Sequence, residues 1–241
     1  MRTRTPGRKR GLGLGLAGVL SLAVAAGCDA GTGGGAGGGA VDGAGATAGT
    51  WPVELPPGAE HWSFEGVEVD SLPAGLEAPV GEWAVESAGG GQVLTQRAQS
   101  AEDAFNLALV RGRSARDLDL WVRVQAVSGE VDQGGGVIWR AAGPRDYYIA
   151  RWNPLERNFR VYTVKDGVRR QLQSALTDLG PEAWHLLRVT MVGDHIQCRL
   201  DGQLLLDVHD TTFAEAGAVG LWTKADAVTR FDDLVLAGRD D

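Results

Sequence analysis

The sequence predicts an all-β fold, a two-sheet antiparallel sandwich, from three observations. From Trp62 onward, short runs rich in β-branched and aromatic residues alternate with breaks of Gly, Asp and Asn. No window of a dozen residues in this part keeps a helical period. Asp-Gly pairs at 166–167 and 201–202 are typical of tight type I′ hairpins, because both residue types tolerate a positive φ. Successive hairpins give antiparallel sheets, so a sandwich or barrel is expected.

Eleven strands are expected, each a β-rich run that ends at one of these breaks. The Asp-Gly turn at 166–167 follows one strand, and the turn at 201–202 joins two others. Between 196 and 200 apolar and polar residues alternate, which puts Ile196, Cys198 and Leu200 on one face and favours a buried, unreactive Cys198. In chain order the expected strands are 82–86, 105–110, 118–127, 136–141, 147–152, 159–164, 184–192, 196–200, 204–208, 219–223 and 229–236.

Residues 1–27 have the pattern of a secretory signal peptide. Five basic residues within the first ten precede an apolar run at 12–26, which is too short to span a bilayer comfortably as a helix. Small residues then lead into Cys28, as in the bacterial lipoprotein signal that this segment resembles, although Ala25 stands where a larger apolar residue is usual. The resemblance implies a lipidated Cys28 that anchors the protein to a membrane of the bacterial cell envelope, facing the periplasm or the exterior. Ordinary secretion is the alternative.

Residues 28–50 are expected to form a flexible linker between the lipidated Cys28 and a folded domain at 51–241. Glycine dominates this stretch, which cannot bury enough apolar surface to offset its chain entropy. A Gly-rich coil of this length has an r.m.s. span of about 25 Å. The folded domain is therefore expected to stay near the membrane surface.

The charge of the chain restricts its partners. The formal net charge is −8, and it becomes −13 once residues 1–27, with five basic and no acidic side chains, are removed. Such a surface repels phosphate backbones and anionic headgroups, which excludes nucleic acid as an expected partner. Membrane attachment is expected to come from the lipid alone. With Cys28 lipidated, only Cys198 remains, so no intramolecular disulfide is expected.

Several motifs together resemble the concanavalin A-like lectin/glucanase superfamily, over about residues 62–237. Within it, the chain is most similar to laminin-G-like sugar-binding modules and to the bacterial 3-keto-disaccharide hydrolase, or family-16-glycoside-hydrolase-like, domain. The resemblance implies a two-sheet jelly roll whose concave sheet holds saccharide in many relatives. The motifs are Gly135-Gly136-Val137-Ile138-Trp139-Arg140, Asp146-Tyr147-Tyr148-Ile149-Ala150-Arg151-Trp152-Asn153, Trp184-His185-Leu186-Leu187-Arg188-Val189, Asp201-Gly202, and Gly220-Leu221-Trp222-Thr223-Lys224-Ala225-Asp226 with Phe231-Asp232-Asp233.

No reaction is assigned, and the catalytic residues are unknown. Glucanases on this fold carry Glu-x-Asp-x-x-Glu, but here Glu68-Val69-Asp70 is followed by Pro73 and Glu130-Val131-Asp132 by Gly135. The remaining acids near the expected cleft are Asp146, Glu156, Asp226 and Asp232. The four histidines are scattered along the sequence, so no metal site is assigned. No cofactor is expected, although structural calcium occurs in some relatives and an oxygen site of this kind leaves little trace in a sequence.

A sugar site is the chemistry that the residues favour most. A saccharide presents apolar C–H patches ringed by hydroxyls, so its site needs an aromatic surface beside fixed hydrogen-bonding groups. Arg140, Arg151 and Asn153 lie on or beside two adjacent expected strands, while Trp222 and Lys224 follow another strand into its turn and share one face. Core packing is the alternative for the tryptophans, and an ion pair with Asp146 or Asp226 is the alternative for Arg151. The candidate ligand-binding residues are Arg140, Arg151, Asn153, Trp222, Lys224 and Asp226.

The sequence therefore predicts a membrane-anchored, extracytoplasmic, lectin-like domain that binds an oligosaccharide or polysaccharide. One alternative is a glycoside hydrolase or 3-keto-disaccharide hydrolase on the same fold, which needs a pair of carboxylates at catalytic spacing. A second alternative is a structural envelope lipoprotein whose cleft is filled by its own side chains. The arrangement of the concave face distinguishes among these three hypotheses.

Overall fold

The computed structural model describes residues 54–238. A boundary between two units falls after Gly43, and everything described below belongs to the second unit, Ala44–Asp241. The expected signal peptide, Cys28 and the expected linker lie outside the described residues. Residues 54–238 contain no helix, so none of them forms a helix that could cross a membrane.

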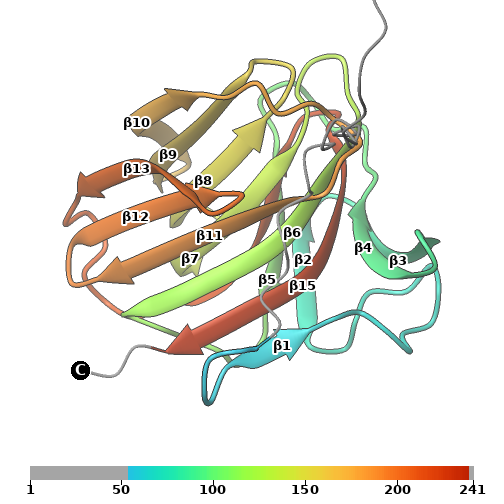
Figure 1. The fold of residues 1–241 in the computed structure, drawn as a ribbon, viewed down its shortest axis with the longest axis horizontal. Helices are drawn as coiled ribbons and strands as arrows, with labels where there is room; N and C mark the ends of the chain where they lie inside the picture. The colour runs from blue at the N-terminus through green and yellow to red at the C-terminus, as the bar shows by residue number, and fades with distance from the viewer. Residues whose placement is uncertain (1–53, 239–241) are drawn as a thin grey trace, which may run out of the picture. The chain divides into compact units, whose positions relative to one another are not determined.

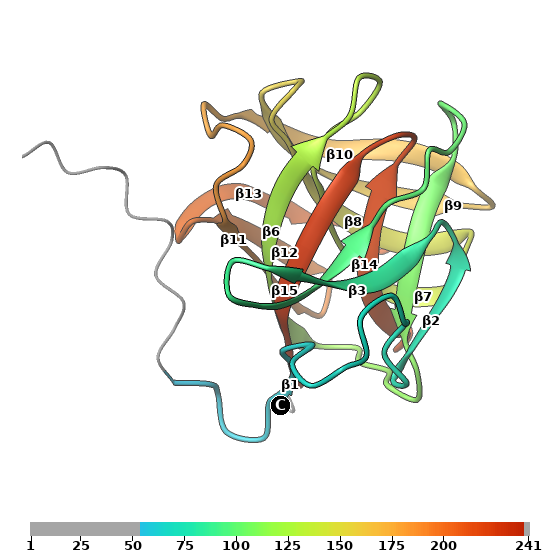
Figure 2. The same cartoon turned by 90° about the vertical axis from the view of Figure 1, so that its right-hand side faces the viewer.

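The predicted all-β sandwich is confirmed. Antiparallel strands form two sheets that face each other, as the two views in Figures 1 and 2 show. The strands are β1 (Glu60–Trp62), β2 (Leu76–Val80), β3 (Trp83–Ala88), β4 (Gly91–Gln96), β5 (Phe105–Val110), β6 (Leu118–Ser128), β7 (Gly135–Gly143), β8 (Asp146–Asn153), β9 (Asn158–Lys165), β10 (Val168–Leu176), β11 (His185–Val192), β12 (His195–Leu200), β13 (Gln203–His209), β14 (Ala218–Lys224) and β15 (Val228–Gly238).

Each sheet mixes distant parts of the chain. The eight-stranded sheet has the order β13-β12-β11-β6-β15-β4-β3, with β1 paired to β15. The seven-stranded sheet has the order β10-β9-β8-β7-β14-β5-β2. The last two strands therefore lie inside different sheets, β14 between β7 and β5, and β15 between β6 and β4. Each of these two strands thus joins the two parts of its sheet.

Both predicted type I′ turns are present. Asp166 and Gly167 have φ angles of 54° and 80°, and Asp201 and Gly202 have φ angles of 50° and 81°. The two turns join β9 to β10 and β12 to β13. Positive φ at both central positions matches the twist of the flanking strands, which is why Asp-Gly fixes the hairpin register here.

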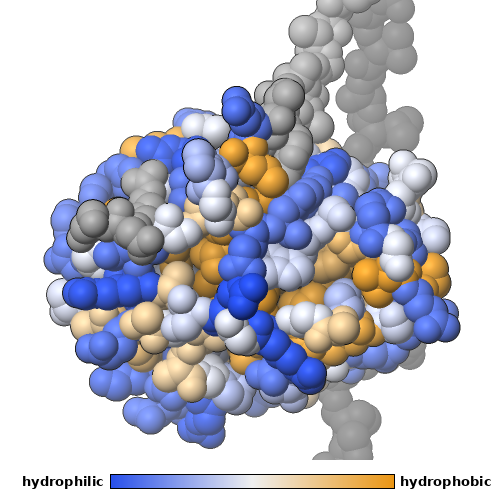
Figure 3. Space-filling model, turned by 90° about the horizontal axis from the view of Figure 1, so that it is seen from below, coloured by the Kyte–Doolittle hydropathy of each residue, from blue (hydrophilic) through white to orange (hydrophobic). Residues whose placement is uncertain are grey.

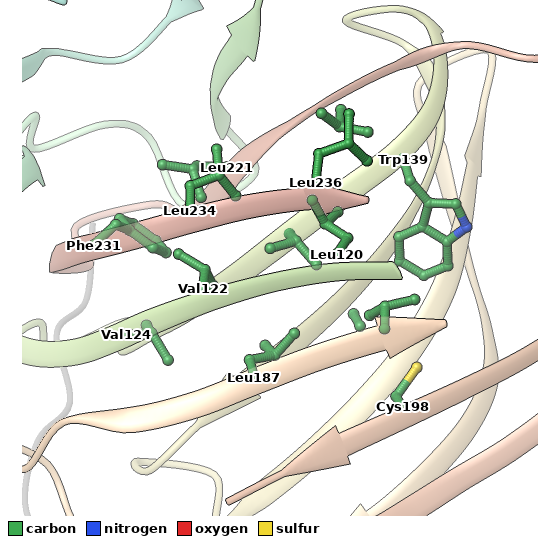
Figure 4. Close-up of a cluster of buried hydrophobic side chains, with 14 of the residues drawn as sticks. Leu120, Val122, Val124, Trp139, Leu187, Cys198, Leu221, Phe231, Leu234 and Leu236 are labelled. Carbon is green, nitrogen blue, oxygen red and sulfur yellow. The ribbon is translucent and has the colours of Figure 1, made fainter. Parts of the chain in front are cut away.

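The main core lies between the two sheets. Figure 4 shows part of it, with Leu120, Val122 and Val124 of β6 beside Leu234 and Leu236 of β15. Trp139 and Trp152 are fully buried in the same core, on the inner face of the seven-stranded sheet. Burying side chains of this size contributes about 1.5–3 kcal/mol each. For Trp139 and Trp152, core packing, the alternative named for the tryptophans, is therefore confirmed.

Cys198 lies in this core and has no exposed surface. Its burial raises the pKa of the thiol far above the ordinary value. A thiol that stays protonated is a poor nucleophile, so Cys198 is the buried, unreactive side chain that the alternation predicts.

The surface seen from below combines hydrophilic and hydrophobic residues, and its hydrophobic residues form several patches that hydrophilic side chains interrupt (Figure 3). Large contiguous apolar patches mark protein or membrane contact sites. This face shows no single dominant patch of that kind among the described residues.

Candidate functional site

The outer face of the seven-stranded sheet carries most of the predicted site residues. Alternation along β8 puts Arg151 and Asn153 on this face, whereas Trp152 points into the core. Alternation along β14 puts Trp222 and Lys224 on the same face, and Trp222 lies opposite Gly136 of β7. Gly136 in turn lies opposite Arg151. Four of the six candidate residues therefore share one face of adjacent strands.

The middle of this face is filled by its own side chains. Trp222 is fully buried and donates a hydrogen bond from Nε1 to Tyr147 Oη at 3.2 Å. The Phe105 ring packs on Trp222 with centroids 5.3 Å apart. The Arg169 guanidinium lies 4.6 Å from the Tyr162 ring centroid, 5.4 Å from that of Phe105 and 5.8 Å from that of Trp222. We call these five residues, Phe105, Tyr147, Tyr162, Arg169 and Trp222, the closed part. Within it, the Trp222 indole contacts Tyr147, Phe105 and Arg169.

The contact between Arg169 and Phe105 shows that the sheet is concave on this side. Arg169 belongs to β10 and Phe105 to β5, with four strands between them. In a flat sheet that separation is about 24 Å, five spacings of about 4.8 Å. An arginine side chain cannot cover this distance. The sheet must therefore curl until β10 and β5 approach each other over the outer face.

Beyond the closed part, a cluster of charged and amide side chains surrounds Asp132 in the loop after β6. Asp132 Oδ1 accepts a hydrogen bond from Asn153 Nδ2 at 2.8 Å and lies 3.9 Å from Arg151 Nη1. Asp132 Oδ2 lies 3.6 Å from Lys224 Nζ. We call this cluster the polar end; it comprises Asp132, Arg151, Asn153, Glu156, Asn158, Arg160 and Lys224.

Glu156, in the β8–β9 turn, forms the outer side of the polar end. Its Oε2 accepts hydrogen bonds from Arg151 Nη2 at 3.0 Å, Asn158 Nδ2 at 2.9 Å and Arg160 Nη1 at 2.8 Å. Asn153 Oδ1 accepts from the Glu156 backbone amide at 2.8 Å and so fixes the turn. The Arg151 side chain is 1 % exposed and that of Glu156 is 40 % exposed, so the cluster runs from the sheet to solvent.

The two carboxylates of the polar end have opposite pKa shifts. Burial raises the pKa of Asp132, and the charges of Arg151 and Lys224 only partly oppose this effect. Burial also acts to raise the pKa of Glu156, but the hydrogen bond from Asn158 and the charge of Arg151 outweigh it, and the pKa falls to about 2. At neutral pH the Glu156 carboxylate is therefore ionised, while the Asp132 carboxyl is the more easily protonated of the two.

Asp226 shapes the loop that carries Asp132. Its carboxylate accepts hydrogen bonds from the backbone amides of Glu130 at 2.7 Å, Val131 at 3.1 Å and Asp132 at 3.0 Å. Burial alone would raise the pKa of Asp226, but these three donors lower it. Asp226 thus holds the Asp132 loop against the β14–β15 turn.

Arg140 lies at the other end of the sheet. It donates hydrogen bonds to the backbone carbonyls of Arg116 at 2.7 Å, Phe213 at 2.8 Å and Gly193 at 2.7 Å, and to Asp117 Oδ1 at 3.2 Å. Its φ of 46° belongs to a bulge in β7, and bulges re-aim side chains. The structure therefore separates Arg140 from the other five predicted residues and places it in a clamp between loops.

Exposed aliphatic side chains and a pocket border the polar end. Val131, Leu155 and Leu176 are 47 %, 49 % and 86 % exposed, and each belongs to a segment beside the cluster. A pocket of about 300 Å³ is lined by Glu156, Arg157, Leu176, Thr177 and Asp178. This volume is at the lower end of the range for small-molecule sites. Aliphatic groups around a polar pocket match the apolar patches and hydroxyls of a sugar ring.

The polar end also has buried polar atoms without partners. Eight buried side-chain nitrogen and oxygen atoms in the described part make no hydrogen bond, and five lie in or beside the polar end. Arg151 Nε, Arg151 Nη1 and Asn158 Oδ1 belong to the polar end, Arg169 Nη1 to the closed part, and Thr177 Oγ1 to the lining of the pocket. Most buried polar groups in proteins are satisfied, so such a concentration needs a physical explanation.

The other acids considered from the sequence lie elsewhere. Asp146 accepts a hydrogen bond from the Asp166 amide in the β9–β10 turn, and Asp232 contacts Arg123 on the eight-stranded sheet. No group of three or more His, Cys, Asp and Glu side chains suited to a metal ion occurs among residues 54–238.

No family model matches the sequence, and neither does any curated protein. Solved structures do match. The carbohydrate-binding module CBM66 from Bacillus subtilis is 19% identical, with a TM-score of 0.59 over 68% of this chain and 96% of that one. A β-1,3-1,4-glucanase (lichenase) from a mouse hindgut metagenome is 11% identical, with a TM-score of 0.54 over 75% and 98%. The chain has a concanavalin A-like fold.

This concanavalin A-like sandwich also occurs as a part of longer proteins. The GH43 protein BlXynB from Bacillus licheniformis is 13% identical, with a TM-score of 0.55 over 74% of this chain, which spans only 39% of the BlXynB chain. The superfamily resemblance drawn from the sequence motifs is thus confirmed at the level of fold. At these identities the fold alone is established, and function must be argued from the site.

Proposed function

We propose that the protein binds carbohydrate through the polar end of its concave face. The unpartnered buried atoms carry this proposal. Arg151 Nε and Nη1 are donors, whereas Asn158 Oδ1 is an acceptor and Thr177 Oγ1 serves as either. Sugar hydroxyls both donate and accept, so a ligand that reaches this cluster can satisfy such a mixed set, of which Thr177 lines the adjoining pocket. Val131, Leu155 and Leu176 then cover the apolar faces of the ligand.

The proposal includes a location. The sequence pattern at 1–28 supports an extracytoplasmic lipoprotein, anchored through a lipidated Cys28 to a membrane of the bacterial envelope. A binding domain on a Gly-rich linker would meet polysaccharide at the membrane surface. Labelling with a radioactive or alkyne-tagged fatty acid tests the anchor, and the Cys28→Ala variant must lose the label.

A glycan array probed with the full-length chain in mild detergent tests the binding proposal. We expect retained glycans whose binding falls at least tenfold in the Arg151→Gln variant. Arg145→Gln is the matched control, because Arg145 is an exposed arginine in the hairpin at the opposite end of the sheet. Failure to retain any glycan would favour the structural envelope role, which the side chains filling the closed part also suit.

A second candidate function is glycoside hydrolysis, favoured by the two carboxylates of the polar end. Asp132 and Glu156 contact different nitrogens of one guanidinium, that of Arg151. Their pKa values are displaced in opposite directions, as in an acid paired with a nucleophile or base. Release of reducing ends from any retained glycan, lost in both Asp132→Asn and Glu156→Gln, would support hydrolysis. Retention without release would restrict the function to binding.

A further inference from the structure

Positive charge is concentrated at the polar end and in the closed part beside it. Four basic side chains, Arg151, Arg160, Arg169 and Lys224, interact there with two acids, Asp132 and Glu156, and Asp226 adds a third carboxylate behind the Asp132 loop. The chain as a whole has a formal charge of −8. This region of the concave face therefore has the opposite sign to the protein that surrounds it.

Two of these cations have buried N–H groups without an acceptor. Arg169 is half-buried and lies over the rings of Tyr162, Phe105 and Trp222, and its Nη1 makes no hydrogen bond. Arg151 uses Nη2 for Glu156, but its Nε and Nη1 make none, and the carboxylate nearest to Nη1 stands 3.9 Å away. Buried cations are normally paired, because an unpaired charge in a region of low dielectric is costly.

Both guanidiniums lie near the Tyr162 ring, with Cζ 5.9 Å from its centroid for Arg151 and 4.6 Å for Arg169. Their mutual repulsion contributes to the lowered pKa of Arg169, after burial as the main cause. An oxyanion that reaches both side chains would relieve this repulsion and accept the free N–H groups, which neighbouring groups cover in this structure. Guanidinium groups suit carboxylates and sulfates because they offer two parallel donors.

We propose that the ligand is an acidic glycan, and that Arg151 and Arg169 bind an oxyanion carried by its sugar ring. This inference rests on the proposed carbohydrate-binding function and narrows it to one class of ligand. The carboxylate of a uronic acid and a sulfate ester present the same chemistry to the two arginines. Neutral glycans would leave the three free N–H groups without an ionic acceptor.

Isothermal titration of the full-length chain tests the proposal. The ligands are oligogalacturonate, its fully methyl-esterified form and a sulfated galactan oligosaccharide of equal length. A glycan array with uronate, sulfated and neutral glycans complements the titration. We expect binding of uronate or sulfated glycans, weakened at least tenfold when the bound uronate is esterified and weakened further by added salt. Binding of only the sulfated series would identify a sulfate ester as the source of the anion. Equal or better binding of neutral glycans would overturn the proposal and leave the proposed function intact. Absence of binding to every glycan would overturn both.

Variants of Arg169 separate a ligand role from a packing role. Arg169→Met keeps the volume over the rings and removes the charge, so we expect at least a tenfold loss of affinity for the acidic glycan with an unchanged or higher Tm. Arg169→Lys should restore part of the affinity. Arg170→Met is the matched control, because Arg170 is the next residue on β10, is exposed and pairs with Asp210. A lower Tm with unchanged affinity would overturn the assignment. If Arg169→Met fails to fold, the difference in affinity between the free and esterified ligands, measured on the native chain, tests the proposal instead.

Discussion

Two buried arginines stand at opposite ends of the seven-stranded sheet, and their surroundings differ. Arg140 donates to three backbone carbonyls and to Asp117, so its guanidinium is held by groups that belong to the fold. Arg151 donates to Glu156 and Tyr162 and keeps two N–H groups free. Arg140 is 3 % exposed and Arg151 is 1 % exposed, so the degree of burial does not distinguish the two residues. What distinguishes them is whether their donors already have acceptors.

The largest effect is expected at Arg140. Arg140→Met removes four hydrogen bonds and leaves three carbonyls and the carboxylate of Asp117 without their partner. We expect a loss of about 3–5 kcal/mol in the free energy of unfolding, measured by urea denaturation. Glycan affinity should be unchanged at temperatures where the variant is folded. A loss below about 1 kcal/mol would mean that Arg140 is not a structural clamp, and the proposed difference between Arg140 and Arg151 would not hold.

A smaller stability effect is expected at Arg151. Arg151→Met removes the bonds to Glu156 and Tyr162, but Asp132 can take up a proton, and Glu156 keeps Asn158 and Arg160. We expect a loss of about 1–3 kcal/mol together with loss of ligand binding. Unfolding and titration of the same protein sample measure both quantities. A stability loss equal to that of Arg140→Met, with binding retained, would make the two arginines equivalent.

Acid should weaken the contacts of Glu156 at the Arg151 end. The pKa of Glu156 is about 2 in the folded protein, below the ordinary value of 4.5, so its contribution is present above about pH 4.5 and is lost as the pH falls toward 2. Because the side chain is 40 % exposed, we expect a contribution of only about 1 kcal/mol. The difference in unfolding free energy between the native chain and Glu156→Gln, followed from pH 6 to pH 2, isolates it. Parallel curves for the two proteins would contradict the assignment.

The smallest effect is expected for an ion pair at the rim of the polar end. Arg157 and Asp178 form a contact in which the side chains are 71 % and 83 % exposed. Asp178→Asn should change the free energy of unfolding by less than about 0.5 kcal/mol, measured by thermal or urea unfolding. A larger change would show that exposed charges at this end are coupled to the buried cluster.

The sequence was sufficient to predict most of the fold, because alternation records which side of a sheet a residue faces. All eleven expected strands overlap strands of the structure, and the two Asp-Gly turns have the expected backbone. The strands β1, β2, β4 and β10 were not expected. β10 is an edge strand whose residues are all half-buried or exposed, and β4 begins at the third of three glycines, so neither has an apolar period to recognise.

The site was predictable only where it follows strand alternation. Arg151 and Asn153, and Trp222 and Lys224, were placed on shared faces by their spacing, and the structure brings them together. Arg140 followed the same reasoning but lies on a bulge, packed where a Cβ on Gly217 would come within 2.4 Å of the Arg140 carbonyl carbon. A bulge of this kind has no alternation signal, so the separation of Arg140 could not be seen in the sequence.

Other residues of the site depend on contacts between distant segments. Asp132 reaches the cluster because Asp226 holds its loop, and Arg169 reaches the aromatic rings because the sheet curls. The sequence places Glu156 among the acids near the expected cleft but does not reveal its neighbours. In the sequence, Glu130-Val131-Asp132 is only an incomplete glucanase motif. A basic residue two positions after the Asp-Gly turn was the one available signal for Arg169.

The pairing of β1 with β15 also determines how the sandwich responds to tension. Force applied to the chain before Glu60 enters the fold at a three-residue strand, whose partners are Leu236, Val235 and Leu234. Detaching β1 breaks that short ladder and the contact between His61 and Asp233, while the pairing of β15 with β6 continues on its other side. We therefore expect the short strand to detach first under load, before the seven-stranded sheet, to which it does not belong, is disturbed.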